Sequence, residues 1–322
     1  MRLLVTGGAG FIGSNFIRYI IKKYPQYKVI NLDKLTYAGN LENLRDIDNN
    51  PNYTFVKGDI CDKVIVDELS REVEAIVNFA AESHVDRSIV DASDFMRTNV
   101  HGTYVLLEVA KKYKIRRFIQ ASTDECYGSI AEGSSKETDA LNPSSPYAAS
   151  KAAADMLVHS YWVTYNLPVN IARSSNNFGP YQYPEKIISL FITNGLEDKP
   201  VPLYGDGMNV RDWLYVIDNC RGIDLILHNG KEGEIYNIGG GNELRNIDLT
   251  KTVLKLLGKP ESLIQPVKDR PGHDRRYSLD CSKIVRQLGW APTFEFEKAL
   301  QETVKWYVDN QWWWRKLKDK RK

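Results

Sequence analysis

The sequence predicts an α/β protein in which a doubly wound parallel sheet is followed by a smaller mixed α/β C-terminal lobe. In the first half, short continuous apolar runs alternate with helical stretches, a pattern typical of parallel strands covered on both faces. A glycine-rich turn joins the first strand to the first helix. From Asn176 the composition changes, and Gly, Pro, Asn and Tyr become frequent. We therefore expect one domain over residues 1–175, to which some later segments return, and a mainly substrate-binding lobe over residues 176–322.

Each element of the first domain follows from its local pattern. Apolar runs predict strands at residues 3–6, 29–32, 53–56, 75–79, 117–121 and 169–173. Helical periodicity predicts helices at residues 11–24, 92–113 and 146–165, and an amphipathic segment at 296–316. Because ligands bind beyond the carboxyl ends of parallel strands, residues 78–83, 121–125 and 174–177 should line the site.

Composition narrows the class of protein. The 322 residues carry a net charge of only +2, which gives no reason to expect a nucleic acid or membrane partner. The four cysteines lack metal-ligand or redox spacing, so we expect reduced thiols in a cytoplasmic protein without a metal centre. We find no apolar stretch of about 20 residues and no signal-peptide layout. The basic run at residues 315–322 is expected to be a solvated tail.

The glycine-rich turn predicts a dinucleotide site. Gly7, Gly10 and Gly13 follow the first strand and open the first helix, where they allow a tight turn, close approach of a pyrophosphate and close helix–strand packing. Asp33 ends the second strand, and its carboxylate can hold both hydroxyls of an adenosine ribose while repelling a 2′-phosphate. The pattern indicates a Rossmann-type sheet that binds NAD rather than NADP. Asp59-Ile60 either meets the adenine edge or is a plain strand end.

Two further segments indicate the chemistry. Tyr147 and Lys151 lie four residues apart on a predicted helix, so the ammonium can sit beside the phenol and favour its phenolate form, a base for alcohol oxidation. Thr123 is followed directly by Asp124 and Glu125. A plain alcohol dehydrogenase needs only the hydroxyl, the Tyr and the Lys, so the two acids suggest a second reaction. Without other information they could equally form a solvated turn.

Together these motifs resemble the extended short-chain dehydrogenase/reductase family over essentially the whole chain, with Asn78-Phe79-Ala80-Ala81 and Asn99 adding to the match. Within that family the chain is similar to the dTDP-glucose 4,6-dehydratases. The segments that carry this likeness are AAESHVDRS (80–88), STDE (122–125), SNNFGPYQ (175–182), NVRDWL (209–214) and DRPGHDRR (269–276).

The resemblance implies a redox-neutral conversion of dTDP-glucose to dTDP-4-keto-6-deoxyglucose, in deoxysugar and rhamnose biosynthesis, with tightly bound NAD regenerated in each turnover. Tyr147, assisted by Lys151, would take the O4 proton during C4 oxidation, and Thr123 would steady O4. Glu125 is the implied base for C5, and Asp124 the implied acid that protonates the departing C6 hydroxyl. Like charges push the pKa values of adjacent acids apart, which suits this division.

The resemblance also implies the binding residues. For NAD these are Gly7, Gly10, Phe11, Ile12, Gly13, Asp33, Lys34, Leu35, Thr36, Asp59, Ile60, Phe79, Ala80, Ala81, Glu82, Ser83, Thr98, Tyr147, Lys151 and Asn177. For the nucleotide sugar they are Ser83, Thr123, Asp124, Glu125, Asn176, Lys186, Ile187, Pro202, Leu203, Tyr204, Arg211, Asn246, Asp269, Arg270, Pro271, Gly272 and His273.

Several of these residues have plainer explanations. Arg211 and Arg270 suit a diphosphate because planar guanidinium groups match phosphate oxygens, yet each could form a surface ion pair. Tyr204 either stacks on the base or packs in the core. Asn99 either supports proton relay or bridges backbone through water. His84 is expected to be a structural hydrogen-bonding residue.

The two long helices predicted at 92–113 and 146–165 carry wide apolar faces, which include Tyr104, Val105, Leu107, Val109, Met156, Leu157, Tyr161 and Trp162. Part of this surface should face the sheet. The surplus resembles the four-helix dimer contact of related enzymes, so we expect a homodimer.

Four other functions are weighed against this interpretation. A sugar-nucleotide 4-epimerase needs the Tyr and Lys but no acid pair, and a sugar-nucleotide decarboxylase needs an extra cation for a uronic acid. An NAD(H)-binding regulator without activity is expected to lack Tyr147, Lys151 or the acids, all of which are present. Another NDP-sugar 4,6-dehydratase is also possible, because the sequence does not separate the nucleotide bases by physics alone.

Overall fold

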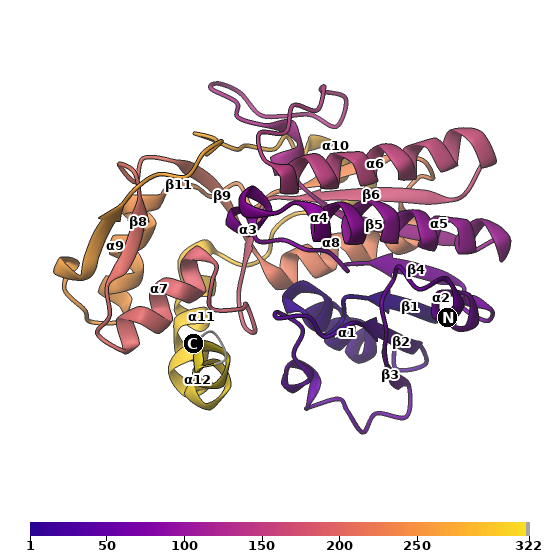
Figure 1. The fold of residues 1–322 in the computed structure, drawn as a ribbon, viewed down its shortest axis with the longest axis horizontal. Coiled ribbons are helices and arrows are strands. Elements are labelled where there is room, and N and C mark those ends of the chain that lie inside the picture. Colours follow the sequence, from indigo (N-terminus) through magenta and orange to yellow (C-terminus); the bar gives the residue numbers. More distant parts are fainter. Residues whose placement is uncertain (320–322) are drawn as a thin grey trace.

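The computed structural model describes residues 1–319, and its centre is a parallel sheet (Figure 1). Within these residues seven strands pair in the order β10-β6-β5-β4-β1-β2-β3. Their bounds are β1 (Arg2–Thr6), β2 (Lys28–Asp33), β3 (Tyr53–Lys57), β4 (Ala75–Asn78), β5 (Arg117–Thr123), β6 (Val169–Ser174) and β10 (Ile235–Ile238). Every neighbouring pair is parallel, as the apolar runs predict.

Helices cover both faces of this sheet. Alternate residues of a strand point to opposite faces, so Leu3 and Val5 pack toward α1 (Phe11–Lys23) and α8 (Val216–Asn229), whereas Leu4 packs toward the other face. That second face carries α2 (Lys63–Ser70), α5 (Thr103–Lys112) and α6 (Pro146–Tyr165). Burial on both sides explains why these strands are continuously apolar.

The helix predicted at 146–165 has those same bounds in α6. Ser145 accepts a hydrogen bond from the Ala148 N–H at 3.1 Å, Pro146 occupies the first turn, and Asn166 ends the helix in the left-handed conformation at φ 53°. All three signals are local, so the sequence alone could define both ends.

The helix predicted at 92–113 is confirmed in its extent, because residues 93–112 are helical throughout, but it is not a regular α-helix. The chain forms α4 (Ser93–Phe95), a π-helical turn η2 (Met96–Gly102) and then α5. A π turn widens the helix and is often found at functional sites. Here it holds the buried Asn99, which makes hydrogen bonds outside its own helix. The wider turn therefore serves a tertiary contact.

The second lobe has its own core. A three-stranded sheet joins β11 (Glu243–Arg245), β9 (Val210–Tyr215) and β7 (Asn176–Phe178), and a second pairs β12 (Ile264–Val267) with β8 (Val201–Tyr204). Four helices pack in this core: α7 (Ile187–Leu196), α9 (Asn246–Leu256), α11 (Phe296–Asp309) and α12 (Gln311–Asp319). The segment expected at 296–316 is thus two helices.

The chain returns from this lobe to the first domain. β10 adds to the edge of the large sheet, and α8 and α10 (Ser282–Leu288) pack near it with the buried Trp290. The expected basic tail is also partly wrong, because Arg315 to Asp319 end α12, whose Trp313, Trp314 and Leu317 are buried. Residues 320–322 of that run lie outside the described residues. Among residues 1–319 no helix is long and apolar enough to cross a membrane.

Candidate active site

A cavity of about 560 Å³ lies at the carboxyl ends of the parallel strands, between the large sheet and the second lobe. Its walls come from the loops after β1, β2, β3, β4, β5 and β6 and from α6, α7, β8 and β9. This is the place where doubly wound sheets bind ligands. The three segments expected there, 78–83, 121–125 and 174–177, contribute to the cavity wall.

One half of the cavity is shaped for a dinucleotide. Gly7 has φ +68°, and a Cβ added there would lie 2.5 Å from the Ala80 nitrogen. At Gly13 an added Cβ would lie 2.4 Å from the Gly7 oxygen, so only glycine allows this turn to pack. No side chain caps the N-terminus of α1, and no acid lies in its first turn. The positive end of the helix dipole is therefore available to a diphosphate.

Asp33 closes the far end of this half. Its two carboxylate oxygens accept hydrogen bonds from the Ala9 N–H at 2.9 Å and the Leu35 N–H at 2.8 Å. Burial raises the pKa of Asp33, although both backbone hydrogen bonds act in the opposite direction. A carboxylate held this way suits the two hydroxyls of a ribose and disfavours a second anion. The residues present therefore fit NAD.

Asp59 is held by cations. Its carboxylate lies 3.0 Å from Lys34 Nζ and 3.0 Å from Arg97 Nη2, and it accepts a hydrogen bond from the Cys61 N–H at 2.9 Å. Burial acts to raise the pKa of Asp59, but these donors outweigh it and the pKa lies below its usual value. Asp59 and Ile60 both line the cavity, in agreement with either of the two interpretations of this strand end.

All but one of the residues predicted for the cofactor line this cavity. Leu35 is the exception, since it does not line the cavity. Its backbone adopts the left-handed conformation at φ 57°, and its N–H supports Asp33. The backbone of Leu35 therefore helps to shape the site.

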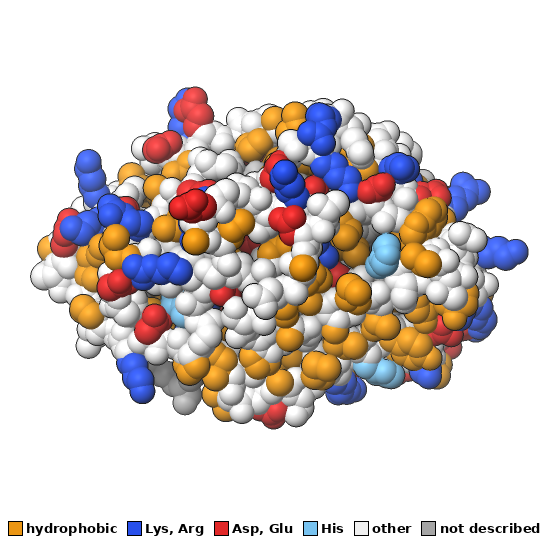
Figure 2. All heavy atoms as spheres, turned by 90° about the horizontal axis from the view of Figure 1, so that it is seen from above, with side chains coloured by type: hydrophobic (Ala, Val, Ile, Leu, Met, Phe, Trp, Pro, Cys, Tyr) orange, Lys and Arg blue, Asp and Glu red, His pale blue; other side chains and the backbone are white. Residues whose placement is uncertain are grey.

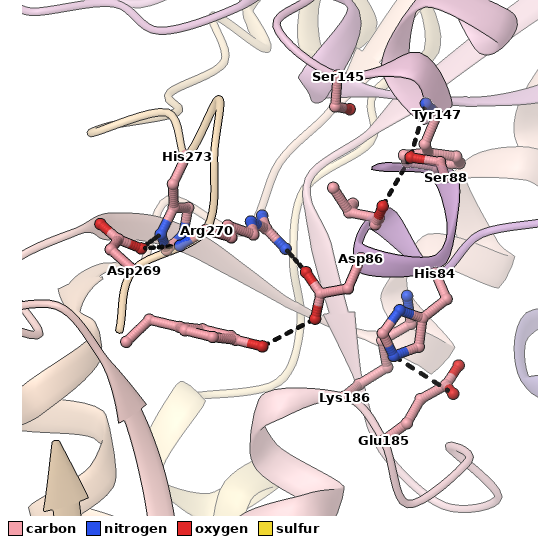
Figure 3. A network of polar contacts seen from close by, with 12 residues as sticks. His84, Asp86, Ser88, Ser145, Tyr147, Glu185, Lys186, Asp269, Arg270 and His273 are labelled. Atoms are coloured by element: carbon pink, nitrogen blue, oxygen red, sulfur yellow. Dashed lines mark hydrogen bonds and ion pairs between the residues drawn. The ribbon is translucent and has the colours of Figure 1, made fainter. Parts of the chain in front are cut away.

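Tyr147 and Lys151 lie on α6 and both face the cavity. The Lys151 ammonium donates to the Ala121 carbonyl at 2.6 Å, and the Tyr147 N–H donates to Ser88 Oγ at 3.2 Å (Figure 3). The expected depression of the Tyr147 pKa is not found. Burial raises it well above its usual value, the charge of Glu125 raises it further, and a hydrogen bond with Thr123 opposes this only in part.

The acid pair occupies the short turn η3 (Asp124–Tyr127) directly after β5. Thr123 caps this turn by accepting the Glu125 N–H at 3.2 Å, and its hydroxyl lies 3.2 Å from Asp124 Oδ1. Within residues 1–319 the buried Asp124 Oδ2 has no hydrogen-bond partner. A buried, unpaired carboxyl oxygen that faces a cavity is well placed to meet a substrate hydroxyl.

The two acids differ in their surroundings. Burial raises the pKa of Asp124 well above its usual value, and the charges of Glu125 and Asp212 add to this. Burial also raises the pKa of Glu125, but Arg270, Lys186 and Arg211 oppose it. Asp124 is therefore the better proton donor near neutrality, and Glu125 the better base.

Asn99 supports the wall of the cavity. It accepts the Glu82 N–H at 2.9 Å and donates to the Glu82 carbonyl at 3.0 Å and to Ser150 Oγ at 2.8 Å. Ser150 in turn donates to the Tyr147 carbonyl at 2.7 Å. Asn99 thus bridges backbone by direct hydrogen bonds, and it links the loop after β4 to the helix that carries Tyr147.

Three cations line the other half of the cavity, which faces the second lobe. Lys186 Nζ donates to the Ser83 carbonyl at 2.6 Å, and burial lowers the Lys186 pKa. Arg211 donates to the Asp274 carbonyl at 2.9 Å and lies 4.3 Å from the centre of the Tyr277 ring. These cations, with Arg270, have the charge and the donor groups that suit a dianionic diphosphate.

Asp86 is a functional candidate that the sequence reasoning missed. Figure 3 shows it between the two lobes, where Tyr204 Oη donates to Asp86 Oδ2 at 2.8 Å and Arg270 Nη1 lies 3.4 Å from Asp86 Oδ1. Tyr204 is therefore not a core residue: it lines the cavity, and its hydroxyl bond leaves the face of the ring available to stack on a base. The only sequence signal was its place within the segment AAESHVDRS.

Most of the residues predicted for the substrate line the cavity, but Asp269, Pro271 and Gly272 do not. Asp269 instead lies 2.6 Å from His273 Nδ1 and shapes the loop that presents Arg270 and His273 (Figure 3). His84 pairs with Glu185 at 3.6 Å, in agreement with a structural role. Tyr277 also lines the cavity and was missed, because only tertiary contacts place it there.

Comparisons with known proteins agree with this site. Residues 4–303 match the protein-family model described as GDP-mannose 4,6 dehydratase. The chain is 52% identical to a dTDP-glucose 4,6-dehydratase of Streptomyces niveus over 99% of this chain and 96% of the relative, and 51% identical to one of Haemophilus influenzae over 96% and 98%. The chain belongs to the dTDP-glucose 4,6-dehydratase family.

Solved structures give the same result. The dTDP-glucose 4,6-dehydratase DesIV from Streptomyces venezuelae, solved with NAD and dTDP, superposes with a TM-score of 0.97 at 54% identity and covers 98% of this chain and all of that one. A UDP-glucose 4-epimerase from Thermotoga maritima reaches a TM-score of 0.89 at 31% identity, over 97% of this chain and 100% of the epimerase. The fold is thus shared with epimerases, and sequence identity favours the dehydratases.

We expect the protein to bind NAD at least about tenfold more tightly than NADP, because a 2′-phosphate would meet the desolvated Asp33 carboxylate. The Asp33→Asn variant should show a smaller difference between its affinities for NAD and NADP. Titration of the cofactor-free protein with each dinucleotide measures both values, and equal affinity of the unmodified protein for NAD and NADP would contradict the assignment.

Proposed function

We propose that this protein is an NAD-dependent dTDP-glucose 4,6-dehydratase that converts dTDP-glucose to dTDP-4-keto-6-deoxyglucose and water. The observation that carries this proposal is the Asp124–Glu125 pair, whose pKa values are raised by desolvation, in the same cavity as Tyr147 and Lys151. Such a product belongs to deoxysugar biosynthesis, for example of rhamnose.

The two halves of the cavity divide the ligands. The glycine turn and Asp33 would hold NAD, so the first domain, with its returning segments, is the NAD-binding part. Lys186, Arg211 and Arg270 would hold the substrate diphosphate at the second lobe. This places the sugar ring between them, beside residues 123–125 and Tyr147.

Bound NAD supplies reversible two-electron chemistry at the sugar and a positive charge near the phenol. Tyr147 takes the proton of the O4 hydroxyl as C4 is oxidised, and Thr123 donates a hydrogen bond to O4. Because burial and Glu125 raise the Tyr147 pKa in the protein alone, the positive charges of Lys151 and the cofactor are needed to favour the phenolate.

The C4 ketone makes the C5 proton acidic, and the acid pair then acts. Glu125 takes the C5 proton, Asp124 gives its proton to the C6 hydroxyl, and the C6–O bond breaks to release water. A proton returns to C5 from Glu125 when C6 is reduced. Over the whole reaction Glu125 returns to its ionised form, while Asp124 has lost one proton and Tyr147 has gained the O4 proton. Transfer of one proton from Tyr147 to Asp124 through solvent balances the charges and restores both groups for the next turnover.

The raised pKa values also predict the form of the pH dependence. Asp124 is an acid only while protonated, so activity falls as the pH rises through its raised pKa. Glu125 is a base only while ionised, so activity falls as the pH drops through its own pKa. The elimination step therefore has a bell-shaped pH profile.

The acid pair also separates this proposal from its alternatives. A 4-epimerase shares the fold, the Tyr and the Lys, but needs no buried acid pair beside them. The three cations in the half of the cavity that faces the second lobe, Lys186, Arg211 and Arg270, are accounted for by a diphosphate, which leaves none of these three for the carboxylate of a decarboxylase substrate. Tyr147, Lys151 and both acids face one cavity, which favours an active enzyme over a binding protein.

Incubation of the NAD-loaded protein with dTDP-glucose should give a product lighter by the mass of one water, because elimination removes the C6 hydroxyl. Mass spectrometry of the sugar nucleotide measures this. A product of unchanged mass with galactose configuration would favour epimerisation, and a panel of other NDP-glucoses run in parallel reports the base preference.

In Glu125→Gln, exchange of the C5 hydrogen with deuterated solvent should fall by about 10²-fold or more, because the general base is lost while shape is kept. Reduction of the bound cofactor on adding substrate should change far less, since Tyr147 and Lys151 remain. Deuterium incorporation by mass spectrometry and cofactor absorbance report the two steps separately. Equal slowing of both would overturn the base assignment.

We also propose that the protein is a homodimer formed through α5 and α6. Of the apolar residues expected there, Val105, Leu107, Val109 and Tyr161 are buried, Tyr104, Leu157 and Trp162 are half-buried, and Met156 is 62% exposed. Val163, two turns further along α6, is 65% exposed on the same face. Hydrophobic side chains gather over the part of Figure 2 where these helices lie. An apolar helix face of this kind supports a four-helix contact between two copies.

Met156→Glu combined with Val163→Glu should convert the dimer to a monomer, because it places charge in the centre of this contact. The matched control is Val64→Glu on α2. Val64 is 68% exposed and lies outside the proposed contact, so this change should leave the dimer intact. Light scattering after size exclusion measures the mass. A dimer that survives the double change would exclude this surface as the dimer contact.

The four free thiols further support action in the cytoplasm.

A further inference from the structure

Directly behind the acid pair lies a buried ion pair that no step of the reaction uses. Arg173 on β6 donates from Nε to Asp155 Oδ2 at 2.9 Å, and the two side chains are only 3% and 1% exposed. Moving two charges out of water is costly, and a well-packed hydrophobic pair is often at least as stable. A buried ion pair in this place therefore calls for an explanation other than stability.

The ion pair holds both ends of the acid-bearing segment. Ser122, which directly precedes Thr123, donates to Asp155 Oδ2 at 2.9 Å. Tyr127, the last residue of η3, accepts from Arg173 Nη1 at 2.9 Å, and the guanidinium carbon lies 4.8 Å from the centre of its ring. One partner thus holds the chain before the acids, and the other holds it after them.

The same ion pair belongs to the oxidation machinery through α6. Asp155 lies one turn beyond Lys151 and two turns beyond Tyr147, on the helix that carries both. Burial lowers the pKa of Lys151, and the charge of Asp155 opposes this. Asp155 therefore connects the helix of the phenol and ammonium to the turn of the two carboxyl groups.

A third element completes the network. Tyr127 Oη donates to Asn237 Oδ1 on β10 at 2.9 Å, and Asn237 Nδ2 donates to the Ser135 carbonyl at 2.9 Å. β10 comes from the part of the chain that returns after the second lobe. Tyr127 is thereby fixed between two neighbouring strands, β6 and β10, and its hydroxyl both accepts and donates.

We propose that Asp155 and Arg173, with Ser122 and Tyr127 as their contacts, are positioning residues that hold the acid pair in register with Tyr147 and Lys151. This inference rests on the proposed function, since it assigns the two segments to successive steps of one reaction. Proton transfer requires groups to lie within hydrogen-bond reach, and a displacement of about 1 Å can cost about 100-fold in rate. A directional ion pair fixes such a distance better than apolar packing does.

Tyr127→Phe tests the proposal, because it removes one contact and leaves the ion pair intact. The acid turn should shift relative to α6, so exchange of the C5 hydrogen and water loss should fall by about 10- to 100-fold. Cofactor reduction, which depends on Tyr147 and Lys151, should stay within about 3-fold, so that reduced cofactor accumulates during turnover.

The matched control is Tyr53→Phe. Tyr53 is 8% exposed against 7% for Tyr127, and its hydroxyl also bonds an asparagine, Asn31, at 2.9 Å. It lies on β3 at the opposite edge of the sheet. Both changes should lower the midpoint of thermal unfolding by similar amounts, but only Tyr127→Phe should separate the two steps of the reaction.

Two results would overturn the proposal. One is a Tyr127→Phe protein with wild-type rates for both steps, and the other is a uniform slowing that Tyr53→Phe shares. If Tyr127→Phe does not fold, Ser122→Ala removes the contact on the other side and should give the same selective loss. If the unmodified protein forms no keto product, the proposed function fails and this inference falls with it; if the product forms, the variants judge the inference alone.

Discussion

Asp124 and Glu125 lie in a cavity between the large sheet and the second lobe, and desolvation is the largest influence on their ionisation and on that of Tyr147, Lys151 and Lys186. It raises the pKa of both acids and of Tyr147, and it lowers the pKa of Lys151 and Lys186. In water these groups would all be in their ordinary charge states. In the cavity, an acid can stay protonated beside a base, which the elimination of water requires.

Groups of opposite charge lie near one another around the cavity and offset part of this desolvation. The positive charges of Arg211 and Arg270 oppose the rise in the Glu125 pKa without cancelling it. Asp86 forms an ion pair with Arg270 across the two lobes. A substrate diphosphate would satisfy the same guanidinium groups, so ligand binding changes the electrostatics of the acid pair as well as its position. Binding and catalysis are coupled through charge in a site of this kind.

Much of this organisation follows from local sequence. The ends of α6 are set by Ser145, Pro146 and Asn166, and the glycine turn by steric demands at Gly7 and Gly13. These signals act over a few residues, so reading them needs no knowledge of the fold. The π turn at Met96–Gly102 had no such signal, because it depends on the contacts of Asn99 with distant residues. Asp86 and Tyr277 were missed for the same reason.

The sequence by itself determined the parallel sheet, the dinucleotide turn and the identity of the reacting groups, because periodicity, steric limits and side-chain chemistry are properties of short segments. Only the tertiary structure decided the ionisation of those groups. A Tyr and a Lys four residues apart suggest a phenolate, yet burial beside Glu125 raises the pKa of Tyr147 in the protein alone. Only the fold also joins Ser122, Tyr127, Asp155 and Arg173, since desolvation and distance depend on which distant segments meet.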